Sequence, residues 1–138
     1  MAVADHVELL RGSDLFDALD ERALARVAGD ATEYECRADT VLIEPGVPAS
    51  GVFVVVEGTV AAETHDGRRH ELGPGQSFGE LSILANTVRT GRVWATTNVR
   101  CLAFGRSEFE RLLETEPAVA RSLLRVLAGR LVEAQSHR

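Results

Sequence analysis

The feature that most constrains the fold is a series of short strand-like segments between residues 31 and 105, separated by turn signals. The segment VFVVVEG is rich in β-branched and aromatic residues, which is typical of a buried strand. Asp66–Gly67 lies between two further strand-like segments and predicts a tight hairpin, and Gly73–Pro74–Gly75 predicts another turn. Strands this short, joined by such turns, predict a small antiparallel β-barrel or jelly roll.

Helical segments are expected on both sides of these strands. The lead, about residues 1–30, carries Asp20 at the position of a helix N-cap before an amphipathic segment. After the strands, Ser107 is expected to cap one helix and Pro117 to open a second, so residues 107–137 are expected to be helical. Because 138 residues suit one domain, the prediction is a single α+β, mainly β domain over the whole chain.

The composition argues against several classes of protein. No apolar run approaches the ~20 residues that span a bilayer, and the first ten residues lack the regions of a secretory signal. We therefore expect a cytoplasmic protein with no membrane partner. The net charge of −6 belongs to residues 1–35, and the remaining residues hold no large basic patch. Direct binding to nucleic acid is accordingly not expected.

The side chains needed for catalysis or metal binding are not gathered in the sequence. His65 and His70 flank one hairpin, but no further ligands are positioned to complete a metal site with them. Ser82 lacks the second glycine of a nucleophile elbow. Cys36 and Cys101 form no CxxC pair and are expected to be buried thiols. A protein that is not an enzyme, with no metal and no cofactor, is the resulting expectation.

One stretch, FGELSILANTVRTG at residues 78–91, combines opposite charges with a glycine. Gly79 allows close approach to a ligand, and the short helix predicted after it presents free backbone N–H groups to an anion. Arg89 offers a planar fork of donors suited to phosphate, and Thr90 adds a hydroxyl. Glu80 would repel phosphate but would accept a hydrogen bond from a sugar hydroxyl. Together they predict a site for a nucleotide whose phosphate lies beside its own ribose.

On these residues the sequence resembles the cyclic nucleotide-binding domain shared by the bacterial catabolite activator protein, protein kinase A regulatory subunits and nucleotide-gated channels. The resemblance extends over residues 15–131. It is carried by LFDAL, Pro45–Gly46, the VFVVVEG strand, Pro74–Gly75, FGELSIL, VRTGRV and the final-helix segment VARSLLRVLAGRL. The most specific part is FGEL followed by an Arg–Thr pair, with the arginine nine residues after its glutamate.

The resemblance implies a ligand site. Glu80 falls on the family's ribose-binding glutamate, Arg89 on its phosphate-binding arginine and Thr90 on the neighbouring hydroxyl residue. Backbone donors complete the phosphate cassette, and the residues concerned are Phe78, Gly79, Leu81 and Ser82. The implied ligand is a cyclic 3′,5′-monophosphate, either cAMP or cGMP, with cAMP favoured.

Four positions depart from the family's usual pattern. Val88 stands where many ligand-binding members have proline, and Gly91 stands where alanine is common. Arg92 replaces a small or hydroxylic residue, and its direction is left open by strand alternation. Ala38–Asp39 replaces a glycine before the second strand, where aspartate can also adopt a left-handed turn. None of these departures removes a ligand contact.

The expected role is a sensor in which the C-terminal helix repacks as a lid over the bound base. In the alternative, Glu80 and Arg89 pair across an empty cassette and the domain serves only protein interaction or dimerisation. A barrel enzyme is a third class. A thermal-shift scan with cAMP, cGMP and divalent metals would discriminate the three.

The final helix also suggests a protein partner. Its apolar stripe is wider than packing on one small barrel requires, and it consists of Leu123, Leu124, Leu127, Leu131 and Val132. A homodimer through this helix is therefore expected, with packing within one chain as the alternative. Activator-type relatives continue into a helix-turn-helix, whereas this sequence ends at Arg138. We expect the signal to pass to a separate effector protein or to another part of a larger one.

Overall fold

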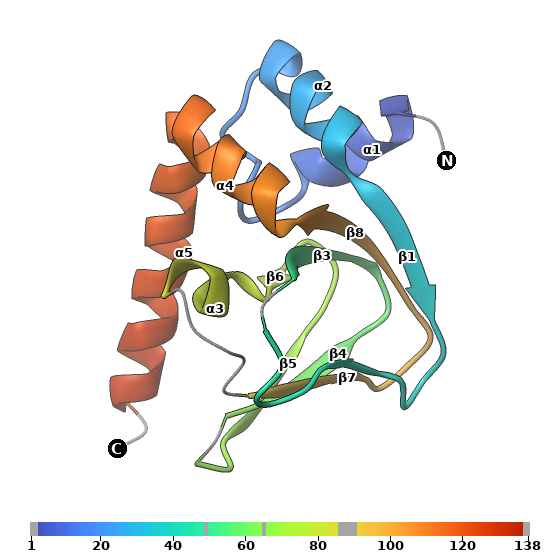
Figure 1. Ribbon diagram of the computed structural model, residues 1–138, viewed down its shortest axis with the longest axis vertical. Helices are drawn as coiled ribbons and strands as arrows, with labels where there is room; N and C mark the ends of the chain where they lie inside the picture. The colour runs from blue at the N-terminus through green and yellow to red at the C-terminus, as the bar shows by residue number, and fades with distance from the viewer. Residues whose placement is uncertain (1–2, 49, 65, 86–90, 137–138) are drawn as a thin grey trace.

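The computed structural model describes residues 3–48, 50–64, 66–85 and 91–136. Two antiparallel sheets of four strands each are flanked by helices, which confirms the expected α+β, mainly β class. The two sheets form a jelly-roll-like sandwich rather than a closed barrel (Figure 1).

The strands follow the segments that the turn signals delimit. The first sheet has the order β1 (Thr32–Cys36), β8 (Val99–Gly105), β3 (Gly51–Glu57) and β6 (Ser77–Phe78). The second sheet has the order β2 (Val41–Ile43), β7 (Arg92–Ala95), β4 (Val60–Glu63) and β5 (Arg69–Leu72). The hairpin predicted at Asp66–Gly67 joins β4 to β5. Gly67 adopts a φ of 85°, a left-handed conformation that glycine tolerates without strain.

The helices are α1 (Val3–Arg11), α2 (Glu21–Asp30), α3 (Glu80–Leu84), α4 (Arg106–Thr115) and α5 (Pro117–Ser136). Helices α1, α2 and α4 gather at one end of the molecule, whereas α5 runs along one side with α3 next to it (Figure 1). None of the helices in the described ranges combines the length and apolar content that crossing a bilayer requires.

The predicted helix starts are confirmed in two cases and wrong in one. Asp20 accepts a hydrogen bond at Oδ1 from the backbone N–H of Ala23 at 2.8 Å, and Pro117 opens α5. Ser107, however, does not cap α4. Because β8 runs directly into the helix, Gly105 occupies the N-cap position and makes no side-chain cap hydrogen bond.

Strand β3 lies between two hydrophobic cores. Val52 and Val54 point into a core shared with the helices, where Phe16, Phe104 and Phe109 are also buried. Phe53 and Val55 point instead toward a second core between the two sheets. Each face of β3 meets one of these cores. Its sequence is therefore a continuous apolar run and does not alternate between apolar and polar residues.

Candidate functional site

The predicted phosphate cassette forms one continuous segment in which β6 turns into α3. Phe78 ends β6 and is buried in the core between the sheets, where its ring stacks on Phe53 with centroids 5.0 Å apart. Gly79 then adopts a φ of 96°, which strongly favours glycine at this position. Glu80 follows as the first residue of α3, and Ser82 and Ile83 are buried on that helix. The segment is thus anchored on both sides of Glu80.

Glu80 is a charged residue with almost no access to solvent, since only 1% of its surface is exposed. Arg130, on α5, donates from Nη1 to Oε1 of Glu80 and from Nη2 to the backbone carbonyl of Ser77. The other oxygen, Oε2, is buried and has no hydrogen-bond partner among the described residues. Burial raises the pKa of Glu80 above its usual range, and the charge of Arg130 opposes this shift.

Asp14 and Ser77 extend this contact into what we call the Arg130 cluster, which consists of Asp14, Ser77, Glu80 and Arg130. The backbone N–H of Ser77 donates to Oδ2 of Asp14 at 3.4 Å. Oδ1 of Asp14 and Oγ of Ser77 are both buried in this contact. Burial also raises the pKa of Asp14, against the positive charge of Arg130. The cluster therefore gathers two carboxyl groups around one guanidinium.

The structure brings together only part of the predicted site. The described segment contains Phe78, Gly79, Glu80 and Ser82. Leu81 lies within α3, but the structure does not describe its side chain. Arg89 and Thr90 fall in residues 86–90, which lie outside the described residues, as does Val88. Their positions next to the ligand remain predictions, as does the alternative pairing of Glu80 with Arg89.

Arg130 is the residue of this site that sequence reasoning missed. It lies fifty positions after Glu80, and no local pattern connects the two. Its helix was predicted, but an arginine within an apolar helix usually indicates a solvated face. Asp14 lies in the turn after α1, where Oγ of the preceding Ser13 accepts a hydrogen bond from the backbone N–H of Leu15 at 3.1 Å.

Gly91, Arg92 and Asp39, which depart from the family pattern, each have a defined place in the structure. A Cβ atom on Gly91 would lie 2.7 Å from the carbonyl oxygen of Glu63, so alanine would not fit here without a backbone shift. Arg92 is exposed and pairs through Nε with Oε1 of Glu44 at 2.7 Å. Asp39 has a φ of 73°, which confirms the left-handed turn expected at this position.

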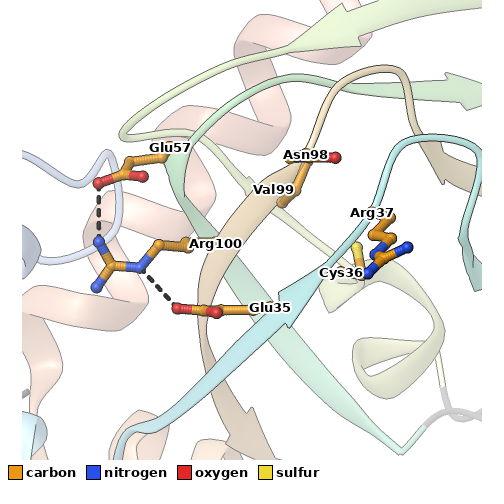
Figure 2. A pocket seen from close by; sticks show the side chains of 7 residues that line it. All are labelled: Glu35, Cys36, Arg37, Glu57, Asn98, Val99 and Arg100. Carbon is orange, nitrogen blue, oxygen red and sulfur yellow. Dashed lines mark hydrogen bonds and ion pairs between the residues drawn. The ribbon is translucent and has the colours of Figure 1, made fainter.

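A separate hollow of about 430 Å³ lies where β1, β3 and β8 meet, and none of the predicted ligand residues lines it. Figure 2 shows Arg100 between Glu57 and Glu35 in this hollow. Arg100 pairs with Glu57 at 2.8 Å and with Glu35 and Glu33 at 3.3 Å each. Since three carboxylates already surround this guanidinium, the hollow is unsuited to a phosphate.

The described residues provide no cluster of three or more histidine, cysteine or acidic side chains that could hold a metal ion. His70 is exposed on β5, and His65 lies outside the described residues. Cys101 is buried as expected, and burial raises the pKa of its thiol to about 12. Cys36 is only half-buried, although burial raises the pKa of its thiol as well. Both thiols are poor nucleophiles in the folded protein.

Known proteins are similar to this chain over most of its length. It is 31% identical over 130 residues to the CRP-like cAMP-activated global transcriptional regulator of Mycobacterium tuberculosis, covering 90% of this chain and 58% of that protein. Glutaminase 2 of Bradyrhizobium diazoefficiens is 35% identical over 127 residues, covering 88% of this chain but only 20% of the glutaminase. The chain therefore spans less than two thirds of either relative.

Comparison of structures agrees with comparison of sequences. The crystal structure of the Thermus thermophilus catabolite activator protein has a TM-score of 0.79 and 28% identity, covering 91% of this chain and 61% of that one. A family model described as the cyclic nucleotide-binding domain matches residues 33–116, which is more than half of the chain and includes both Glu80 and the position of Arg89. The chain belongs to the cyclic nucleotide-binding domain family.

Proposed function

We propose that this domain is a sensor that binds a cyclic nucleotide beside α3, with cAMP favoured over cGMP, and signals through α5. The observation that carries the proposal is the buried carboxylate of Glu80, whose Oε2 has no partner among the described residues. A buried acceptor without a donor costs about 1–3 kcal/mol, and a ribose hydroxyl would supply that donor. No turnover is involved, so the domain acts by binding and not as an enzyme.

Each group of the ligand has a proposed partner in the cassette. Glu80 accepts a hydrogen bond from the 2′-hydroxyl of the ribose, which is the only free hydroxyl of a 3′,5′-cyclic nucleotide. Arg89 donates to the phosphate oxygens, and the hydroxyl of Thr90 adds a neutral donor. The backbone N–H groups of Gly79, Leu81 and Ser82 face the same phosphate. The ligand requires no metal or other cofactor in this scheme.

The signal reaches α5 because Arg130 connects that helix to the ribose-binding residue. A ligand shifts a conformational equilibrium only by binding one state more tightly than the other. A change at Glu80 alters the bond that holds α5 against α3, so ligand binding repositions the helix. A second copy of the chain or a separate effector protein then binds the repositioned helix.

Calorimetric titration with cAMP and cGMP tests the phosphate contact. We expect Arg89→Ala to weaken binding by about 10- to 150-fold, because a charge-assisted hydrogen bond contributes about 1.5–3 kcal/mol. Arg92→Ala is the matched control, since Arg92 pairs with Glu44 at the surface, and should leave the affinity unchanged. Equal affinities for wild type and Arg89→Ala would refute the proposed phosphate contact.

A second candidate function is a domain that binds no nucleotide and acts only in protein interaction. It is favoured by Arg130, which already occupies one oxygen of Glu80, and by the exposed apolar residues of α5. A thermal-shift scan with cAMP, cGMP and divalent metals separates the candidates. Stabilisation by a cyclic nucleotide supports the sensor, whereas no response to any addition supports the interaction domain.

A further inference from the structure

The turn between α1 and α2 is hydrogen-bonded to the strand that leads into the cassette. Strand β6 is the last strand of its sheet and, among the described strands, pairs only with β3. The backbone N–H of Asp14 donates to the carbonyl oxygen of Gly75 at 2.9 Å. In return, the backbone N–H of Ser77 donates to Oδ2 of Asp14 at 3.4 Å. The side chain of Asp14 therefore supplies an acceptor that no neighbouring strand provides.

The surroundings of Asp14 hold it in this place. The residues on either side of it, Ser13 and Leu15, are 0% exposed, so the turn cannot swing into water without uncovering the core. Glu80 begins α3 only three residues after Ser77. A shift of Ser77 would therefore also move the carboxylate that is proposed to bind the ribose.

Asp14 also affects the charge of Glu80. The groups that face the two carboxyls are Arg130 from α5, Ser77 from β6 and Asp17 from the turn itself, besides the two carboxyls themselves. Burial raises the pKa of Glu80, the charge of Arg130 lowers it, and the negative charge of Asp14 raises it further. Removal of the charge at Asp14 would therefore lower the pKa of Glu80.

We propose that Asp14 is a positioning residue of the ligand site, which fixes Ser77 at the start of the cassette and sets the charge state in which Glu80 meets the sugar hydroxyl. This inference rests on the proposed function, which places that hydroxyl on Glu80. Through Asp14, the helical lead before the sandwich contributes to ligand affinity without touching the ligand.

Calorimetric titration with cAMP at about pH 8 tests the positioning. Asp14→Ala removes the acceptor for Ser77, and we expect it to weaken binding about fivefold or more. Asp14→Asn keeps an acceptor oxygen at the same place, so its affinity should lie within about twofold of wild type. Asp17→Asn is the matched control, because it removes the same charge from an exposed position of the same turn, and it should leave the affinity unchanged.

The pH dependence of the same affinity tests the effect on charge. The ionised carboxylate of Glu80 is the stronger acceptor for a hydroxyl, so binding by wild type should strengthen as the pH rises from about 4.5 through the raised pKa of Glu80. In both Asp14 variants this rise should occur at lower pH, because the pKa of Glu80 is lower there. Asp17→Asn should keep the wild-type profile. The purine ring also takes up a proton at acid pH, but it does so equally for every variant.

Two measurements on the ligand-free protein separate the role of Asp14 from the proposed function. NMR titration of labelled glutamate carboxyl groups, with Glu80→Gln to assign the signal, should give a lower pKa for Glu80 in Asp14→Asn than in wild type. Amide exchange at Ser77 should be faster in Asp14→Ala, which lacks the acceptor, than in wild type or Asp14→Asn. A thermal melt of each variant verifies that it is folded.

The possible results distinguish this role from the proposed function. If wild type binds cAMP and Arg89→Ala weakens binding, but Asp14→Ala binds as tightly as wild type, Asp14 does not position the cassette. Equal losses in Asp14→Ala and Asp14→Asn would overturn the positioning as well, because the acceptor oxygen would not restore binding. An unchanged pKa of Glu80 in Asp14→Asn would overturn the effect on charge. If wild type binds neither cAMP nor cGMP, the proposed function fails, and with it the role of Asp14 toward a ligand, whatever the ligand-free measurements show.

Discussion

Glu80 is an acidic residue that the fold buries almost completely and pairs with a single guanidinium among the described residues. Its burial raises its pKa above the ordinary value of 4.5, so the folded protein holds this proton more tightly than the unfolded chain. The contribution of Glu80 to stability is therefore largest at low pH. It declines as the pH rises from about 4.5 through the higher pKa of the folded state.

Glu80→Gln should reveal this dependence, because glutamine has a similar shape and does not titrate. We expect the free energy of unfolding of wild type to fall relative to that of Glu80→Gln as the pH rises above about 4.5. Urea denaturation of both proteins between about pH 4 and pH 8 measures the difference. Asp14 and Arg130, the other charged residues of the Arg130 cluster, are present in both proteins, so their own titration contributes to both measurements. A difference that grows in favour of wild type would contradict the assignment.

At this scale the sequence predicted local backbone conformation better than side-chain partners. The left-handed turn expected at Asp39 is confirmed, whereas the close approach of a ligand to Gly79, which has a φ of 96°, stays a prediction. The pairing of Glu80 with Arg130 depends on how α5 crosses the domain, which no local pattern encodes. The cap expected from Ser107 was wrong because only the structure shows that β8 runs directly into α4.

Helix α5 is held to the core by one side and leaves the other side exposed. Leu123 is 3% exposed and belongs to the core formed with the helices, whereas the adjacent Leu124 is 69% exposed. These two leucines form a matched pair on the same turn of the same helix. The sequence predicted the width of the apolar stripe, but not which part of it would be covered, because that depends on the position of the first sheet.

Leu123→Ala should lower the free energy of unfolding by about 2–5 kcal/mol, because it leaves a cavity in the core. Leu124→Ala should change it by less than about 0.5 kcal/mol in the monomer, because its side chain is mostly in water. Urea denaturation at low protein concentration measures both. Similar losses for the two variants would mean that α5 does not dock as described.

Two elements were not delimited by the sequence, and each has a physical reason. Helix α1 lies within the helical lead expected over about residues 1–30, but it is only nine residues long, and an isolated helix of this length is marginal in water, so its stability comes from packing against α2. Strand β6 has only two residues, which is too short to show any periodicity. It is defined by its pairing with β3, in which Phe78 lies opposite Phe53.

At the scale of the whole molecule, the proposed ligand site lies between the β-sandwich and α5, a helix that is exposed on one side (Figure 1). Strands β3 and β8 of the first sheet are buried on both sides, since one face meets the helices and the other meets the second sheet. The cassette is fixed to this sheet through β6, whereas α5 touches the cassette through Arg130. Movement of α5 therefore requires fewer buried contacts to change than movement of the cassette would.

The exposed side of α5 supports the expected homodimer. Leu124, Leu131 and Val132 are 69%, 59% and 61% exposed, and the last two lie about two helical turns after Leu124 on the same side of the helix. A second copy of the same helix would cover these side chains and remove them from water, which favours association. Light scattering of the chain should then give a mass of twice 14.9 kDa.

Leu131→Glu should return the protein to a monomer, because it would place a charge inside the proposed helix pair. Val47→Glu is the control, since Val47 is a 50% exposed apolar residue away from α5, and it should leave the dimer intact. Because the proposed function has cAMP reposition α5, the nucleotide should also shift the dimer equilibrium, so each protein is measured with and without nucleotide. A wild-type chain that stays monomeric in both conditions at every concentration would remove α5 as a dimer interface. Its exposed leucines would then be available only to a different protein.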